Sequence, residues 1–154
     1  MAAPSADDRS QPILRIPRDQ TPVAITLEGG ERANAMLFVP PGTSVKRWLT
    51  DPAPFVPVAF STGTKLVARA SIACVTVHVI HAHVEEFEEL CERQRSLVRL
   101  RGGQMVRGEV RWIPDSENRR MLDHLNDHST HLVIHVDDQV SYIAKTNVAS
   151  VEEL

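Results

Sequence analysis

Long hydrophobic runs and catalytic signatures are both missing from this sequence. No apolar segment approaches the roughly 18 residues that a membrane-spanning helix requires, so we expect no membrane span. The chain has no G-x-S-x-G nucleophile motif, no P-loop and no G-x-G-x-x-G motif after a strand. One group of clustered carboxylates is typical of a solvated helix face: Glu85, Glu86, Glu88 and Glu89. We therefore expect a protein without catalytic activity and without a cofactor.

Cysteine is scarce as well, since the chain contains only Cys74 and Cys91. They are far apart in the sequence and form no C-x-x-C pair. Residues 1–12, MAAPSADDRSQP, have neither the cationic start nor the apolar centre of a secretory signal. Both observations favour the cytoplasm, where thiols stay reduced and serve as small apolar side chains.

Basic charge and aromatic residues do not dominate either. The formal net charge is −3 and aromatic residues make up 5% of the chain, which argues against a strongly basic nucleic-acid binder. A local basic patch remains compatible with these values. The 154 residues, of which 42% are hydrophobic, indicate one soluble domain or two very small ones.

The second half of the sequence repeats the pattern of the first half. The Gly-Gly pair of AITLEGGERANAM, residues 24–36, aligns with that of VRLRGGQMVRGEV, residues 98–110, at an offset of 73 positions. KLVARASIACV, residues 65–75, aligns with SYIAKTNVASV, residues 141–151, at an offset of 76. A single three-residue insertion near residues 115–120 accounts for the change. We therefore expect a tandem duplication of one small domain.

Each copy has the same expected plan, β-β-α-β-β. An alternating strand precedes the Gly-Gly pair, which predicts a two-residue primed turn with positive φ. A second strand (33–39; 105–113) and a short helix (around 44–51; 117–127) follow, with Ser44 as a plausible N-cap. Two further strands close each copy, at 55–60 and 65–78 and at 131–136 and 139–151. Such a unit is typical of a small SH3-like or Sm-like β-barrel.

The expected domain organisation has four segments. Residues 1–20 contain three prolines and little periodicity, so we expect a disordered arm. The first small β-barrel spans 21–81 and the second spans 98–154. Between them, residues 82–97 place apolar side chains at a spacing of three to four, which predicts an amphipathic connector helix. The predicted fold is therefore mainly β with short helices, built as two tandem barrels joined by a helix.

The second copy resembles the Sm-like proteins, including the bacterial host-factor type. In LRGGQMVRGEV the spacing from Gly103 to Gly108 is similar to that family's first motif. YIAKTNVASV, residues 142–151, resembles its closing strand pair, and Lys145 lies where the family often has a basic residue. RRMLDHLND resembles a phrase found in small uncharacterised bacterial β-domains. The first copy departs from the Sm pattern, because Ala35 replaces the bending glycine and the RNA-contacting aspartate–asparagine pair has no clear match. The resemblance implies a small barrel.

Two groups of residues are candidates for binding a partner. If the side chains of residues 98–111 point alternately to the two faces of a hairpin, Arg99 and Arg101 share one face, and so do Arg107 and Arg111. The two strands are neighbours, so four guanidinium groups could gather on one face. Such a cluster suits a phosphate or an acidic partner, and a solvated face that discourages edge pairing is the alternative. Trp48 and Phe55 lie beside the proline-rich connections FVPPG and DPAPFVPV, which indicate either stiff loops around a core or an apolar docking site.

All seven histidines lie between residues 78 and 135. His81 and His83 would share a face of an extended strand. His124 and His128 are four residues apart on a predicted helix, a spacing that can hold zinc. The two pairs belong to different copies, and surface or interface histidines are the alternative interpretation.

These observations favour a non-enzymatic interaction or adaptor module that binds a protein partner at a strand edge or in the groove between the copies. The candidate contacts are Trp48, Phe55, Arg99, Arg101, Arg107 and Arg111. One alternative is an Sm-like RNA-binding or other nucleic-acid-binding protein that forms a ring and uses Arg107, Arg111 and Lys145. Another is a metal-binding protein that uses His81, His83, His124 and His128. Self-association is compatible with each of these.

Overall fold

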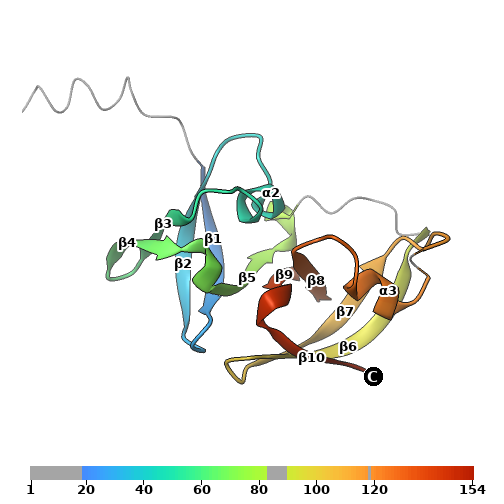
Figure 1. Cartoon of the computed structure of the whole chain (residues 1–154). Coiled ribbons are helices and arrows are strands. Elements are labelled where there is room, and N and C mark those ends of the chain that lie inside the picture. Colours follow the sequence, from blue (N-terminus) through green and yellow to red (C-terminus); the bar gives the residue numbers. More distant parts are fainter. Residues whose placement is uncertain (1–18, 83–89, 118) are drawn as a thin grey trace, which may run out of the picture.

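Residues 19–82, 90–117 and 119–154 are described by the computed structural model, and their strands form one antiparallel sheet (Figure 1). The first half contains β1 (Asp19–Leu27), β2 (Arg32–Val39), α2 (Val45–Leu49), β3 (Phe55–Phe60), β4 (Gly63–Ala68), the 3-10 helix η1 (Arg69–Ser71), β5 (Ile72–His78) and the 3-10 helix η2 (Val79–His81). The second half contains β6 (Glu92–Leu100), β7 (Met105–Trp112), α3 (Met121–Leu125), β8 (His131–Val136), β9 (Gln139–Ala144), the 3-10 helix η4 (Lys145–Asn147) and β10 (Val148–Glu153).

The strand order in the sheet is β10-β6-β7-β8-β9-β5-β1-β2-β3-β4. The prediction of a mainly β protein with short helices is confirmed. Among the described residues the sheet is not closed, because β10 and β4 each have a neighbour on one side only. The two halves share this sheet through the antiparallel pair β5–β9, which we call the internal junction. It runs from Cys74↔Ile143 to His78↔Gln139.

Every strand pairing of the first half recurs in the second half. The pairing Asp19↔Val39 between β1 and β2 corresponds to Glu92↔Trp112 between β6 and β7, at an offset of 73. The pairing Phe55↔Ala68 between β3 and β4 corresponds to His131↔Ala144 between β8 and β9, at an offset of 76. These offsets equal those of the sequence alignment. The two halves therefore have the same backbone pairing pattern.

The plan β-β-α-β-β is wrong in its last element. The segments 65–78 and 139–151, each expected to be one strand, break at η1 and η4. Before the break the chain pairs with β3 or β8, and after it the chain crosses to pair with β1 or β6. The crossing lets Ile72–Val75 be buried on consecutive positions, as in strands covered on both faces. Each half thus has five strands and not four.

The hairpin turns are three residues long, so the expected two-residue primed turn is wrong. Leu27 N donates to Glu31 O at 2.8 Å, and Gly30 N donates to Leu27 O at 2.9 Å. Gly30 has φ +100° and its counterpart Gly103 has φ +96°, while Gly29 is not in this region. This geometry is that of a three-residue loop with glycine in the left-handed position.

The tips of the two hairpins meet. A Cβ on Gly102 would lie 2.9 Å from the backbone oxygen of Glu28, and Gln104 Nε2 donates to Gly30 O. The tips therefore pack backbone against backbone, and this contact adds to the internal junction in holding the halves together.

Two hydrophobic clusters form the core, one under each half, and they exchange residues across the internal junction. Val140 and Tyr142 of β9 belong to the cluster of the first half. Ala73 and Cys74 of β5 belong to the cluster of the second half. Each half is therefore completed by side chains from the other.

The expected boundaries of the arm and the connector need correction. Strand β1 begins at Asp19, and residues 1–18 lie outside the described residues. Residues 92–97, expected in the connector helix, form the start of β6, where Ser96, Val98 and Leu100 are buried in alternation. Residues 83–89, the centre of the expected helix, also lie outside the described part. The expected N-cap is confirmed, since Ser44 Oγ accepts from Arg47 N at 3.1 Å.

Gly108 provides a test of how closely β7 and β8 approach. A Cβ at this position would lie 2.4 Å from Ile134 Cγ2 and 2.6 Å from His135 O. We expect Gly108→Ala to lower the free energy of unfolding by about 1–3 kcal/mol, the usual cost of overpacking. Gly29→Ala is the matched control, because its Cβ would meet nothing closer than 3.8 Å. Urea denaturation of both variants measures the difference, and equal stability of the two would contradict the close approach.

Candidate functional site

The end strands β4 and β10 are exposed where their counterparts are buried. Leu66 of β4 is 75% exposed, whereas Tyr142, at the equivalent position of β9, is 4% exposed. Val75 of β5 is fully buried, whereas its counterpart Val151 in β10 is half-buried. Strands β9 and β5 cover each other at the internal junction, whereas no strand of the described residues lies on the outer side of β4 or β10, which accounts for the difference.

The internal junction joins the halves through both backbone and side chains. Thr76 Oγ1 and Ser141 Oγ, which face each other in the register, lie 2.7 Å apart. Beside them Val75 faces Tyr142, whose pKa is raised by burial. A polar pair next to an apolar pair is therefore the pattern with which a β5-type strand pairs with a β9-type strand in this protein.

Phe55 and Trp48, the predicted apolar contacts, have different environments. Phe55 is 61% exposed at the start of β3, directly opposite Ala68 of β4. Trp48 is only 7% exposed and packs in the hydrophobic cluster of the first half, with the Arg69 guanidinium 4.9 Å from the centre of its ring. The prediction that Trp48 presents a contact surface is therefore wrong, because Arg69 covers the ring. Phe55 remains a candidate and extends the exposed edge of β4.

An arginine face covers the outer side of β6 and β7. The register places Arg93 opposite Arg111, Arg95 opposite Glu109, and Arg99 opposite Met105, while the alternate residues point into the core. The arginine face therefore consists of Arg93, Arg95, Arg99, Arg107 and Arg111. Arg101 does not belong to it, because it lies in the hairpin turn and its Nε donates to Thr146 O at 2.7 Å.

Acidic residues compensate only part of this charge. Glu109 Oε1 lies 2.6 Å from Arg111 Nε and 3.6 Å from Arg93 Nη1. Within the described residues, no ion pair is found for Arg95, Arg99 or Arg107. The arginine face can therefore accept an anionic group at one end while Glu109 orders the other end.

The corresponding outer face of the first half is a groove and carries little charge. The groove has a volume of about 580 Å³ and reaches across the internal junction to Gln139. Met36 and Ala24 lie at the positions of Glu109 and Leu97, and Arg32 is the only arginine that lines it. Apart from Gln139, its lining residues belong to the first half, so this cavity is not the predicted groove between the copies.

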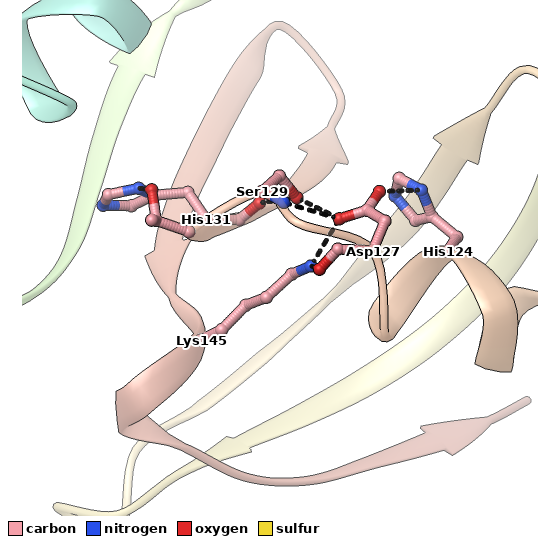
Figure 2. A network of polar contacts seen from close by, with 6 residues as sticks. His124, Asp127, Ser129, His131 and Lys145 are labelled. Carbon is pink, nitrogen blue, oxygen red and sulfur yellow. Dashed lines mark hydrogen bonds and ion pairs between the residues drawn. The ribbon is translucent and has the colours of Figure 1, made fainter.

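A polar network ties α3 to η4 in the second half (Figure 2). Asp127 Oδ1 accepts from Lys145 Nζ at 2.8 Å and from Ser129 N at 2.9 Å. Asp127 Oδ2 lies 3.3 Å from His124 Nδ1, and the His124 ring stacks on Trp112 at 5.7 Å. Figure 2 shows His131 pointing away from this carboxylate, toward the first half.

The first half contains a version of the same network. Asp51 Oδ1 accepts from Ala53 N at 2.9 Å, and Arg69 Nε donates to Ala53 O at 2.8 Å. Asp51 and Arg69 stand at the positions of Asp127 and Lys145. Because a cation at the start of the 3-10 helix holds the loop after the short helix in both halves, we assign the network a structural role. Lys145, predicted as a nucleic-acid contact, is engaged by Asp127 and lies outside the arginine face.

The network sets the protonation of its members. Partial burial alone would raise the pKa of Asp127, but Lys145 and the hydrogen bonds from Ser129 outweigh it and hold that pKa well below its usual range. Burial lowers the pKa of His124, and Lys145 lowers it further against the opposing effect of Asp127. Burial and the Arg69 guanidinium lower the pKa of His131. Both histidines are therefore neutral at physiological pH.

The structure does not support the predicted metal site. Over residues 19–82, 90–117 and 119–154, no group of three or more histidine, cysteine, aspartate or glutamate side chains is placed to hold a metal ion. His81 lies on η2 in the first half, His128 is exposed in the loop after α3, and His83 lies outside the described residues. Cys74 and Cys91 are free, and burial raises the pKa of the Cys74 thiol.

Sequence reasoning missed Leu66, Arg93 and Arg95. The sequence analysis assigns the two arginines to the connector helix, although the alternation of Ser96, Val98 and Leu100, all buried in the structure, signals a strand that includes them.

Comparisons with protein-family models, with curated proteins and with solved structures each found no match. No helix of the described residues has the length and apolar character needed to cross a membrane.

The two shielded histidines predict a pH-dependent stability. Their pKa values are lowered in the folded state, so the unfolded state binds more protons below about pH 6.5, and the free energy of unfolding falls as the pH drops. We expect the double variant His124→Gln, His131→Gln to lose less stability between about pH 7.5 and 5.5 than the unchanged chain. Urea denaturation at both pH values measures this. His128→Gln, at an exposed position, is the control, and an equal effect of control and double variant would contradict the assignment.

Proposed function

We propose that this protein is a non-enzymatic interaction module, built as a tandem duplication of one small SH3-like or Sm-like unit. It binds a protein partner by addition of an extended segment to the free edge of β4. Main-chain hydrogen bonds provide affinity in this mode of binding, and alternate side chains provide specificity. Leu66 and Phe55 are the apolar contacts of the proposed edge, and Lys65 is the charged one.

One observation carries the proposal: Leu66 is 75% exposed while its counterpart Tyr142 is 4% exposed. The two residues stand at equivalent positions of the two halves, but β5 lies beside Tyr142, whereas no described strand lies beside Leu66 on the outer side of β4. Exposed edge strands are usually protected by charge, proline or short length. On β4 a single lysine accompanies the exposed leucine, which supports an edge that receives a partner strand.

Site-specific photo-crosslinking at Leu66 tests the proposal. A photoreactive amino acid at position 66 of the full chain, expressed in its native cell, is expected to capture a defined partner within contact distance of β4. Leu66→Lys is expected to reduce recovery of that partner at least tenfold, because it places a second charge on the apolar edge.

Ile113 provides the matched control, because it is 44% exposed directly after the end of β7 in the other half and lies away from the edge. A photoreactive residue at position 113 should not capture the same partner, and Ile113→Lys should not reduce its recovery. Identical captures at both positions, or none at position 66, would contradict the proposal.

The arginine face supports a second candidate function, the binding of single-stranded nucleic acid. The specific observation is that five arginines share one outer face of β6 and β7, and that Glu109 pairs with two of them only. Arginine side chains bind phosphate groups through charge-assisted hydrogen bonds. The alternative partner of this face is an acidic protein segment.

Salt dependence of RNA binding tests this second candidate. If Arg95 and Arg107 each neutralise a phosphate, Arg95→Gln with Arg107→Gln should weaken binding and reduce the slope of log affinity against log salt by about 1.4 for a single strand. Fluorescence anisotropy with a labelled oligonucleotide measures both quantities. Arg47→Gln with Arg119→Gln removes the same charge outside the arginine face. Equal effects of the two double variants would remove the face from consideration.

A further inference from the structure

We infer that the partner strand on the β4 edge is β10 of a second copy of this chain, so that copies associate head to tail. The inference rests on the proposed function of β4 as a docking edge and names its partner. The internal junction, the pairing pattern of the two halves, and the charges of the two free edges together carry it.

The internal junction shows which strand types pair in this protein. It joins β5, the last strand of the first half, to β9, the fourth strand of the second half. The last strand of the second half is β10, and the fourth strand of the first half is β4. Within residues 19–82, 90–117 and 119–154, these two strands are the free ends of the sheet. Each copy therefore pairs one last strand (β5) with one fourth strand (β9) internally. It leaves the other last strand (β10) and the other fourth strand (β4) with a free edge.

The free edges match in register. In the association between copies, β10 takes the place of β5 and β4 takes the place of β9. The pair Val75↔Tyr142 of the internal junction then corresponds to Val151 of one copy opposite Leu66 of the next. It turns Thr76↔Ser141 into Glu152 opposite Lys65. The hydroxyl pair of the internal junction is thus replaced by opposite charges that face each other, an arrangement that stabilises strand pairing. An apolar pair again lies next to the polar one.

Pairing with a second copy also accounts for the apolar exposure on the first half. Leu66 would occupy the place of Tyr142, which is inserted in the core of the neighbouring half. Phe55 would occupy the place of His131, which is half-buried close enough to Arg69 of the other half for that charge to lower its pKa. The counterpart of Arg69 is Lys145, so Phe55 would face a cation of the second copy. Both exposed apolar side chains of this edge are therefore covered by the same association.

The junction between copies lacks one contact of the internal junction. Gln104 Nε2 donates to Gly30 O where the hairpin tips meet, and Glu31 stands at the position of Gln104 in the first half. A glutamate carboxylate cannot donate this hydrogen bond at neutral pH. The association between copies is therefore expected to be weaker than the internal junction and to depend on protein concentration. Since its two surfaces differ, it forms closed rings or open chains.

Sedimentation velocity of the full chain over about a hundredfold range of concentration is the primary measurement, because short edge pairings are weak. We expect species that are integer multiples of the chain mass, with the larger ones favoured at high concentration. Leu66→Lys should weaken association at least tenfold, and Ile113→Lys, at an exposed position beyond the end of β7, should leave it unchanged.

A charge exchange tests the register. Lys65→Glu and Glu152→Lys should each weaken association, because each places like charges opposite one another. When these two variants are mixed, each β4 edge of one variant faces a β10 edge of the other with opposite charges, so alternating assembly of the two variants should be restored. Assembly that stops at a dimer and tolerates Glu152→Lys would indicate that two β4 edges pair with each other, which would overturn the inference.

The outcomes separate this inference from the proposed function. A chain that stays monomeric throughout, while position 66 still crosslinks to a different protein, overturns association between copies and leaves β4 as a docking edge. Association that is insensitive to Leu66→Lys and Lys65→Glu places the contact elsewhere and overturns the inference. If position 66 then crosslinks to nothing, the proposed function falls as well.

Discussion

The pairing of β5 with β9 is the constraint on which the rest of the fold depends. Strand β5 lies between β1 and β9, so its polar backbone groups have neighbours on both sides and its side chains on both faces reach a core. Val75 completes the first cluster, and Cys74 the second. Tyr142 of β9, in the second half, packs in turn into the cluster of the first half. The halves are therefore not independent domains, because separating them would expose apolar side chains of both clusters to water.

The same pairing explains why the protein has two unlike edges. The fourth and the last strand of each half end that half's part of the sheet, and the β5–β9 pairing covers one strand of each type. The remaining edges differ in protection, since β10 carries Glu152 and Glu153 while β4 carries Leu66 beside Lys65. Charged side chains discourage unwanted strand addition. Opposite charges on the two edges disfavour pairing of either edge with itself and favour pairing of one with the other.

Sequence reasoning recovered the local features and missed the long-range ones. Both hairpins, both short helices and the Ser44 cap follow from alternation, glycine and capping rules. The breaks at η1 and η4 were missed because the segments ARAS and AKTN contain neither glycine nor proline. The β5–β9 pairing joins residues about as far apart as the two halves themselves, and no local periodicity encodes it. Trp48 was misjudged because the residue that covers it, Arg69, is distant in the sequence.

Comparison of the two halves separates structural residues from candidates for function. Asp51 and Asp127 occupy one position and cap the same loop, and Arg69 and Lys145 hold that loop from the same place. What both halves share therefore maintains the fold. The outer faces differ although the backbone beneath them is the same: one is a groove lined by a single arginine, and the other is the arginine face. Because the backbone pairing is the same under either surface, folding does not require the arginines, and their gathering on one half supports the proposal that this face binds a ligand of opposite charge.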